Sequence, residues 1–513
     1  MDQGANMTRE QGMQTDMTGN GQPQAQAETD RGALLAALRG LEGEVAAASA
    51  QAMEVWGPLL RREEFRASAA NMAAYLALRR ADLRPLQRPL AALGLSSLGR
   101  AEGHVRPSLA AVIAALERIA GAPAEFPPAD AFALPARILA ARRDALFGGA
   151  PGGPQTRILV TLPTEAATDA GMMPRLLAAG ADCVRINTAH DWPEVWAAMI
   201  AQTRAAAEAA GRRVPVSMDL AGPKIRIASV ARVEDVRLRI GDRFALATDA
   251  GVALDLPVAV LSHAELFAHM PVDQPVWIND GKLRARVVER PGDGCAILVV
   301  TGARAKGEKL KPEKGVNLPG ADLAIPALTE EDRGKLDFVA AHADIVALSF
   351  VQTVEDVQEL LAELESRCEG RALPAVMLKI ETPLAVRNLP QMIVAAGGRV
   401  PVAVMIARGD LAVEIGFERL SEMQEEMLWL CEAAQVPVVW ATQVLEGLLR
   451  DGQASRAETT DAAMGQRAEC VMLNKGPYLA EAAAFLRTVL SRMDRHQDKK
   501  FAHLGPLGAW RLP

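Results

Sequence analysis

The chain has 513 residues, of which 50% are hydrophobic and 23% are charged, a composition that excludes a mainly disordered chain, a collagen-like repeat and a disulfide-rich mini-protein. Its formal net charge of −7 argues against a protein built around nucleic-acid binding, which requires a basic face. No apolar run approaches the roughly 18 residues of a membrane span, and the five scattered cysteines favour buried thiols in a reducing cytoplasm.

The first third of the chain divides into a tail and a helical part. Residues 1–30 are rich in Gln, Met, Gly, Asp and Thr, which predicts a disordered tail. Residues 31–150 carry apolar side chains at helical spacing on an Ala-rich background, which predicts a helical N-terminal extension. Its Gly/Ser-rich loop at 93–100 favours packing between helices over anion binding, and Gly and Pro at 148–154 indicate a linker.

After the linker, eight short apolar runs alternate with helical segments. Continuous apolar strands separated by helices are typical of a parallel sheet covered on both faces, and eight such units indicate an α/β fold of the (β/α)₈ TIM-barrel class. We expect the barrel domain to occupy 151–226 and 314–490, followed by a C-terminal tail over 491–513. The predicted strands are 157–162, 182–187, 214–220, 344–350, 375–381, 400–407, 436–442 and 469–474.

One connection, between the third and fourth strands, is much longer than the others. Residues 227–313 have little helical character and contain turn residues between alternating strands. This pattern predicts a small β-barrel domain inserted in a barrel loop. Because loops at the carboxyl ends of barrel strands lie beside the active site, the insertion is placed to act as a lid.

Polar residues end or follow every predicted strand after the first. Charges in strands this apolar are costly unless they are paired or bind a ligand, and the strand ends meet at one rim. Glu381 and Asp410 offer oxygen ligands for a hard divalent cation such as Mg²⁺. The cations suit an anionic, phosphate-bearing substrate and, with the metal, phosphoryl transfer; they are Arg185, Lys224, Arg226, Lys379 and Arg408.

An internal salt bridge is the structural alternative for any single member of this set, and Arg408 is the member to which it applies most directly. For His190 considered alone, a structural hydrogen bond is a better interpretation than general-base catalysis. The repetition of polar residues at successive strand ends favours a functional site for the set as a whole.

Seven segments of residues 155–475, in order and at matching spacing, resemble the pyruvate kinase family. The resemblance implies a barrel with an inserted β lid, and a glycolytic kinase of the alcohol-group acceptor class that moves the phosphoryl group of phosphoenolpyruvate to ADP, giving pyruvate and ATP. The segments are CVRINTAH (183–190), MDLAGPKIR (218–226), KGVNLPG (314–320), LKIE (378–381), IARGDL (406–411), ATQ (441–443) and RAE (456–458).

The resemblance also implies roles for individual residues. Glu381 and Asp410 would hold Mg²⁺ or Mn²⁺, while Lys379 would stabilise charge on the phosphoryl group and the enolate. Arg185 would grip the phosphoryl group, and Thr442 would lie near the methylene carbon that is protonated. The remaining substrate-binding residues would be Ser349, Arg408 and Gly409, the last through its N–H, and the nucleotide phosphates would face Asn187, His190 and Arg226.

Several positions depart from the family pattern. Many members bind K⁺ near an Asn, a Ser, an Asp-Thr pair and a Glu, but here Ala189, Leu220 and Lys224 occupy the Ser, Thr and Glu positions. The Lys224 ammonium can supply the charge of the missing ion, so we expect no K⁺ requirement. The loop Asn474–Tyr478 also departs from the family pattern, as do Gln352 and Glu313. We expect these differences to alter the nucleotide side of the binding pocket.

The family's C-terminal regulatory domain is expected to be absent, and the N-terminal extension resembles those of divergent bacterial pyruvate-kinase-like proteins. We expect a homo-oligomer that binds neither nucleic acid nor membrane. Two alternatives stay open: another enzyme of phosphoenolpyruvate or 2-oxo acids with a different acceptor, and a non-catalytic ligand sensor.

Overall fold

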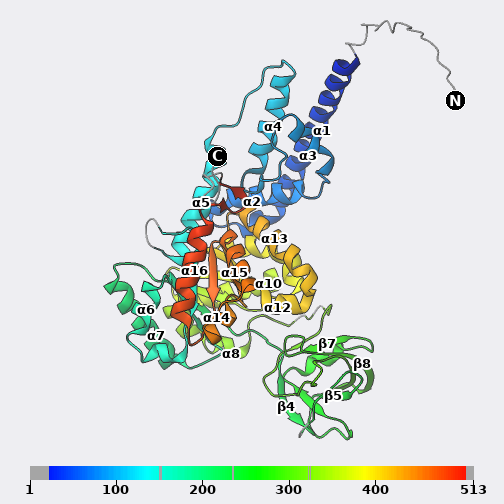
Figure 1. The fold of residues 1–513 in the computed structure, drawn as a ribbon, viewed down its shortest axis with the longest axis vertical. Coiled ribbons are helices and arrows are strands. Elements are labelled where there is room, and N and C mark those ends of the chain that lie inside the picture. The colour runs from blue at the N-terminus through cyan, green and yellow to red at the C-terminus, as the bar shows by residue number, and fades with distance from the viewer. Residues whose placement is uncertain (1–21, 150–152, 234–235, 322, 324, 504–513) are drawn as a thin grey trace, which may run out of the picture.

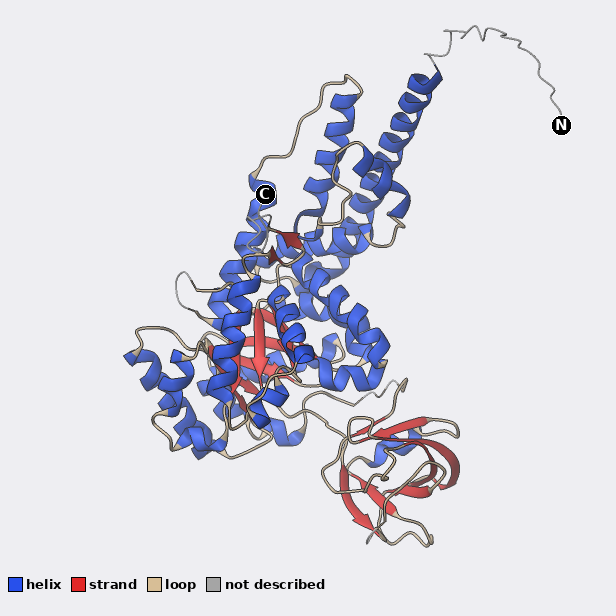
Figure 2. Cartoon of the chain, in the orientation of Figure 1, coloured by secondary structure: helices blue, strands red, loops and turns tan. Residues whose placement is uncertain are grey.

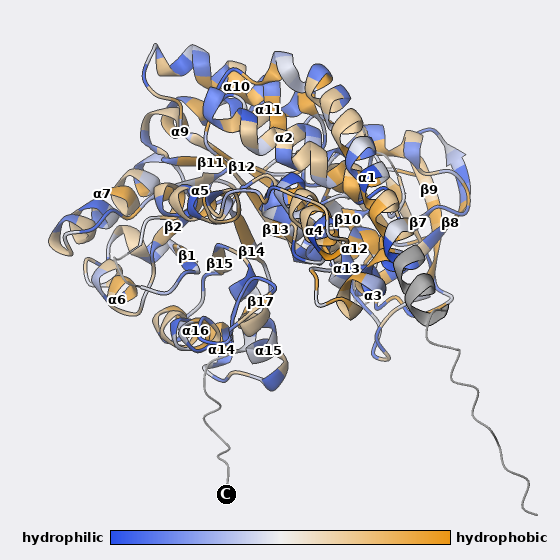
Figure 3. Cartoon of the chain, turned by 90° about the horizontal axis from the view of Figure 1, so that it is seen from above, coloured by the Kyte–Doolittle hydropathy of each residue, from blue (hydrophilic) through white to orange (hydrophobic). Residues whose placement is uncertain are grey.

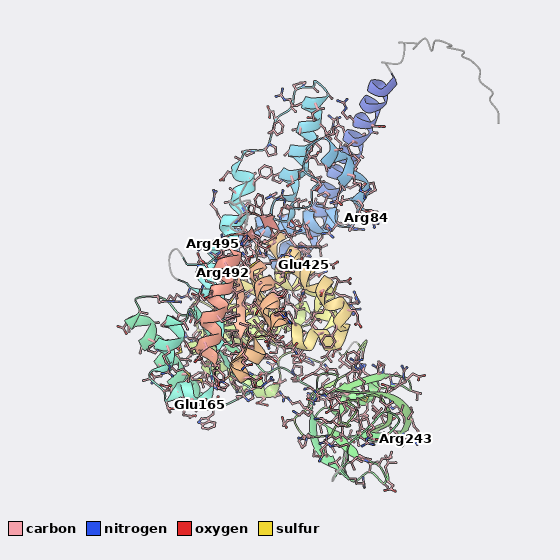
Figure 4. The ribbon with its side chains drawn as sticks, in the orientation of Figure 1. Arg84, Glu165, Arg243, Glu425, Arg492 and Arg495 are labelled. Atoms are coloured by element: carbon pink, nitrogen blue, oxygen red, sulfur yellow. The ribbon has the colours of Figure 1, made fainter. Side chains whose placement is uncertain are left out.

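The computed structural model describes residues 22–149, 153–233, 236–321, 323 and 325–503 (Figure 1). Helices of the N-terminal part lie at one end, a barrel wrapped in helices lies in the middle, and a separate sheet lies at the other end (Figure 2). Arg84 among the N-terminal helices and Arg243 on the separate sheet mark these two ends (Figure 4). The predicted fold class is confirmed.

Eight parallel strands close into the predicted barrel, in the order β1-β15-β14-β13-β12-β11-β3-β2. The strands are buried almost throughout, which explains their continuous apolar runs, and helices surround them (Figure 3). The strands are β1 (Arg157–Thr161), β2 (Cys183–Asn187), β3 (Val216–Asp219), β11 (Ile345–Leu348), β12 (Ala375–Ile380), β13 (Val402–Ala407), β14 (Val438–Ala441) and β15 (Cys470–Leu473).

Helices and short 3₁₀ turns connect these strands. Thr353 and Ser455 each form a capping box, so two of the helices begin where the sequence supplies a hydroxyl and an acidic residue three positions later. The connecting helices are α6 (Met172–Ala178), α7 (Pro193–Ala209), α8 (Glu330–Arg333), α9 (Leu336–His342), α10 (Val354–Cys368), α11 (Pro383–Gly397), α12 (Arg408–Ile415), α13 (Phe417–Ala433), α14 (Glu446–Asp451), α15 (Arg456–Met464) and α16 (Leu479–Met493).

The inserted domain is a seven-stranded sheet in the order β10-β7-β8-β9-β5-β6-β4. At the base, the edge strand β4 meets the residues that lead into the other edge strand, β10, where the N–H of Ile227 donates to the carbonyl of Lys314 over 2.9 Å. β10 lies just beyond the boundary expected at 313. The strands are β4 (Ile227–Ala231), β5 (Arg243–Ala247), β6 (Val258–Leu261), β7 (Pro275–Ile278), β8 (Leu283–Gly292), β9 (Cys295–Gly302) and β10 (Val316–Asn317).

The N-terminal extension is helical, as predicted, but its first helix begins earlier than expected. Helix α1 starts at Gln22, inside the predicted disordered tail, because the run after it is rich in Gln, Ala and Glu, which favour helix. Residues 1–21 of that tail lie outside the described residues. The helices are α1 (Gln22–Trp56), α2 (Glu63–Leu78), α3 (Arg84–Ala92), α4 (Val105–Ile119) and α5 (Asp130–Phe147).

Helix α5 closes the amino-terminal end of the barrel. Its last residues, Leu146 and Phe147, are buried in one cluster with side chains of the barrel interior such as Met377 and Met405. Asp144 on the same helix accepts from Arg157 at the start of β1 over 2.6 Å. The extension therefore supplies part of the barrel core.

The predicted C-terminal tail over 491–513 is wrong as far as residue 503. Helix α16 continues to Met493, and a hairpin of β16 (Gln497–Asp498) and β17 (Phe501–Ala502) follows. Lys499 and Lys500 in its turn form ion pairs with Glu469 and Glu102, which fixes the hairpin between barrel and extension. Residues 504–513 lie outside the described residues, and no described helix has the length and apolar character needed to cross a bilayer.

Replacing Phe147 by Ala tests the role of α5. Phe147 is fully buried at the barrel end, and removing a buried Phe side chain costs about 3–5 kcal/mol. We expect a loss of that size in the free energy of unfolding, measured by urea denaturation. Phe126→Ala is the matched control because Phe126 is 56% exposed. Equal stability of the two variants would show that α5 does not close the barrel.

Candidate active site

A cavity of about 620 Å³ opens at the carboxyl ends of the barrel strands and is bounded on one side by Ser262 and His263 of the inserted domain. The described residues contain no group of three or more His, Cys, Asp or Glu side chains arranged to hold a metal ion. The predicted site residues that line the cavity are Arg185, Asn187, His190, Lys224, Arg226, Ser349, Lys379, Glu381, Asp410 and Thr442.

A chain of opposite charges lies at the bottom of this cavity. Nε of Arg185 donates to Asp219 over 2.7 Å, and the ammonium of Lys379 lies 3.5 Å from the same carboxylate and 3.4 Å from Glu381. Lys379 also donates to Ser349 over 2.5 Å. All of these side chains are buried, so each charge depends on its neighbours for stabilisation.

Lys224 and Asp410 form a second pair across the cavity, with 2.7 Å between Nζ and Oδ1. Burial disfavours the ammonium, but the charge of Asp410, the hydrogen bond to Asp410 and the charge of Glu381 together outweigh burial and raise the pKa of Lys224. Burial, aided by the charge of Asp410, raises the pKa of Glu381 against the opposing effects of Lys379 and Lys224. Across both groups the positive and negative charges are equal in number. The three cations are Arg185, Lys224 and Lys379, and the three carboxylates are Asp219, Glu381 and Asp410.

Strained backbone marks two of the strand ends. Phe350, after β11, has φ of 55°, and Thr442, after β14, has φ of 61°. Residues other than glycine in this left-handed region cost free energy and concentrate at functional sites. The strain at Phe350 brings its N–H to the Glu381 carboxylate, over 2.5 Å.

A second cavity of about 460 Å³ adjoins the first and shares Arg185, Asn187 and His190 with it. Burial, and then the charge of Lys475, lower the pKa of His190. Lys475 lines this cavity and has no hydrogen-bond or ion-pair partner in the described part of the chain. The sequence indicated Lys475 as a polar residue at the end of the last strand and its loop as a departure from the family pattern, but assigned it no role, so its free ammonium is an added functional candidate.

Arg408 and Gly409 are not among the residues that line the cavity, and their contact with substrate stays a prediction. The side chain of Arg408 runs toward α15, forms an ion pair with Asp461, and donates to the Thr442 carbonyl over 2.7 Å. Its guanidinium also lies 4.4 Å from the centre of the Trp440 ring. The N–H of Gly409 donates to Oγ1 of Thr442 over 2.6 Å. The internal salt bridge considered for Arg408 is the observed arrangement.

Asp332 is a second residue that sequence reasoning missed. Its carboxylate is fully buried and accepts from the N–H groups of Ala221, over 2.9 Å, and Gly222, over 3.0 Å. Gly222 has φ of +67° and lies against the backbone of Ser349. Asp332 thereby fixes the turn that precedes Lys224. The Thr-x-x-Asp spacing at 329–332 indicates a helix start but not this contact.

The comparisons with known proteins concern this same part of the chain. The family model described as pyruvate kinase, barrel domain, matches residues 154–483. A pyruvate kinase of Methylorubrum extorquens is 35% identical over 348 residues, which cover 66% of this chain and 69% of the relative. One from Agrobacterium vitis is 33% identical, covering 67% and 69%, and one from Thermococcus litoralis is 31% identical, covering 67% and 70%.

The structural role of Arg408 can be tested by its replacement with Met. Removing one partner of a fully buried ion pair costs about 3–5 kcal/mol, and we expect about 2–3 kcal/mol in unfolding free energy because the Asp461 side chain is 28% exposed. Arg419→Met, at a position whose side chain is 62% exposed, should leave stability unchanged. An Arg408→Met protein as stable as this control would contradict the role.

Proposed function

The chain belongs to the pyruvate kinase family, and from this premise we propose that it transfers the phosphoryl group of phosphoenolpyruvate to ADP in the cytoplasm. The enol oxygen of phosphoenolpyruvate loses the phosphoryl group, a β-phosphate oxygen of ADP receives it, and the enolate takes a proton at its methylene carbon. The observation that carries the proposal is the single cavity that holds Arg185, Lys379, Glu381 and Asp410.

The donor set fits the magnesium ion that the family uses. Glu381 and Asp410 present carboxylate oxygens to one cavity that has room for substrate and water, and Mg²⁺ typically takes one or two carboxylates with substrate oxygens. These two residues would hold Mg²⁺ or Mn²⁺, which when bound neutralises charge on substrate oxygens.

The protein's own groups would act by position and charge. Arg185, fixed by Asp219, would bind the phosphoryl group. Lys379, held by Ser349 and Glu381, would stabilise negative charge as the phosphoryl group leaves the enolate. Thr442 would lie at the methylene carbon; its Oγ1 is positioned by the Gly409 N–H.

The nucleotide would bind on the side of the cavity formed by Asn187, His190 and Arg226, with Lys475 as an added cation. The inserted domain, proposed as a lid over residues 227–313, contributes Ser262 and His263 to the cavity wall. Closing such a lid would exclude water from the phosphoryl group.

Lys224 would replace the monovalent cation. Its ammonium already neutralises Asp410 at 2.7 Å, so added K⁺ has no unbalanced charge to compensate. We propose that turnover is independent of K⁺.

The direct test of the function is pyruvate formation from phosphoenolpyruvate and ADP with Mg²⁺, with and without K⁺. We expect turnover that K⁺ does not change, and a loss of about 10³-fold or more for Lys379→Met, because a preorganised charge is removed. Lys282→Met, on the exposed part of the insertion, should match the parent protein. Absent turnover together with Mg²⁺-dependent binding of phosphoenolpyruvate would point to a different acceptor, and a strong K⁺ requirement would overturn the role of Lys224.

The role of Lys475 predicts a selective defect. We expect Lys475→Gln to raise KM for ADP roughly tenfold or more, the value of a lost hydrogen bond to a charged group, and to leave KM for phosphoenolpyruvate unchanged. Steady-state kinetics with each substrate varied would measure both, and Lys282→Gln is the control. An unchanged KM for ADP would show that Lys475 does not contact the nucleotide.

A further inference from the structure

A third cavity, of about 220 Å³, lies at the opposite end of the barrel from the active site. Four parts of the chain form it: the N-terminal extension, Gln155 before β1, the end of α13 with the residue before β15, and the C-terminal hairpin. At about 30 Å³ per water molecule, the volume corresponds to about seven waters, the size of a small metabolite.

One wall of this cavity is apolar. It consists of one face of α5, where residues recur at the spacing that places helical side chains on the same side. The ring of His104 packs edge-on against the first of these residues, with 5.0 Å between ring centres. The wall residues are Phe132, Pro135, Ala136, Leu139 and Ala140.

The opposite wall is charged, and its lysines already have partners. Lys499 lies 2.6 Å from Glu469, and Lys500 pairs with Glu102 while lying 4.3 Å from the centre of the Trp429 ring. The other charged lining residues are Arg143, which donates to Asp144, Arg100, which lies over the Phe501 ring, and Asp498 in the hairpin.

Two lining carboxylates have no side-chain hydrogen bond or ion pair among the described residues: Asp498 in the hairpin and Glu432 on α13. Glu432 lies in the last turn of α13, where the helix dipole disfavours a negative charge. Burial raises the pKa of Glu432 to about 7; Lys499 opposes this increase, and the nearby Glu102 and Glu469 add to it.

We propose that this cavity binds a small molecule that carries an ammonium group on an apolar body. The ammonium would pair with Glu432, and the apolar body would pack on the face of α5 around Phe132 and Leu139. Such a ligand supplies the direct ion-pair partner that the Glu432 carboxylate lacks and covers an apolar wall that otherwise faces water. A simple amine and an amino acid share this chemistry.

Calorimetric titration of the full chain with 3-methylbutylamine and with L-leucine tests the proposal. The two probes have the same apolar body, and 3-methylbutanol supplies that body without the ammonium. We expect saturable binding of the amine, the amino acid or both, and none of the alcohol. Binding of only one ammonium probe would identify the source as an amine or as an amino acid. Absence of binding by both ammonium probes, or equal binding by the alcohol, would overturn the proposal.

Two variants localise the binding. Glu432→Gln should weaken it at least tenfold, whereas Glu418→Gln, at an exposed position on the same helix, should not. Affinity of the parent protein should rise about tenfold from pH 6 to pH 8 as Glu432 loses its proton, and this rise should vanish in Glu432→Gln. Ala136→Trp, which fills the cavity from α5, should also prevent binding. Equal affinity of Glu432→Gln and the parent protein would contradict the assigned site.

Discussion

Charge balance at the carboxyl end of the barrel is the constraint on which the rest of the site depends. Arg185, Asp219, Lys379 and Glu381 form one continuous chain of opposite charges in a buried position. Removing ions from water is expensive, and their mutual attraction offsets that cost only when every charge has a partner. Neighbouring parallel strands make such a chain possible because their ends meet at one rim. The same balance holds these cations at the cavity that we propose for an anionic substrate.

The two ends of the barrel serve different needs. At the amino-terminal end, α5 inserts Phe147 into the barrel interior, so packing there is dense and apolar. At the carboxyl end, the barrel opens into a cavity. Hydrogen bonds fix the loops around it, such as those from the N–H groups of Ala221 and Gly222 to Asp332. The N-terminal extension therefore stabilises the barrel from the end opposite the proposed chemistry. The inserted domain lies at the other end of the molecule (Figure 1) and contributes residues to the cavity wall.

Strand positions and most of the site could be predicted from the sequence, because buried strands leave continuous apolar runs and their ends carry the polar residues. The direction of a side chain at a strand end could not. Arg408 directly follows β13, and Lys379 lies near the end of β12. The Arg408 side chain nevertheless turns toward Asp461, whereas the Lys379 side chain lines the cavity. Contacts between distant segments were also invisible: Lys500 and Glu102 are separated by 398 positions. No local pattern encodes such a pair, so the hairpin at 497–502 could not be distinguished from a tail.

The fixed ammonium of Lys224 is the feature that most directly links this charge balance to the proposed reaction. The decisive measurement is a K⁺ titration of the rate of pyruvate formation by the Lys224→Gln protein, with tetramethylammonium chloride as the ionic-strength control. We expect a low rate without K⁺ that K⁺ restores and tetramethylammonium does not, since the glutamine leaves Asp410 without its counter-charge. A Lys224→Gln protein that is fully active without K⁺ would contradict the role assigned to this ammonium.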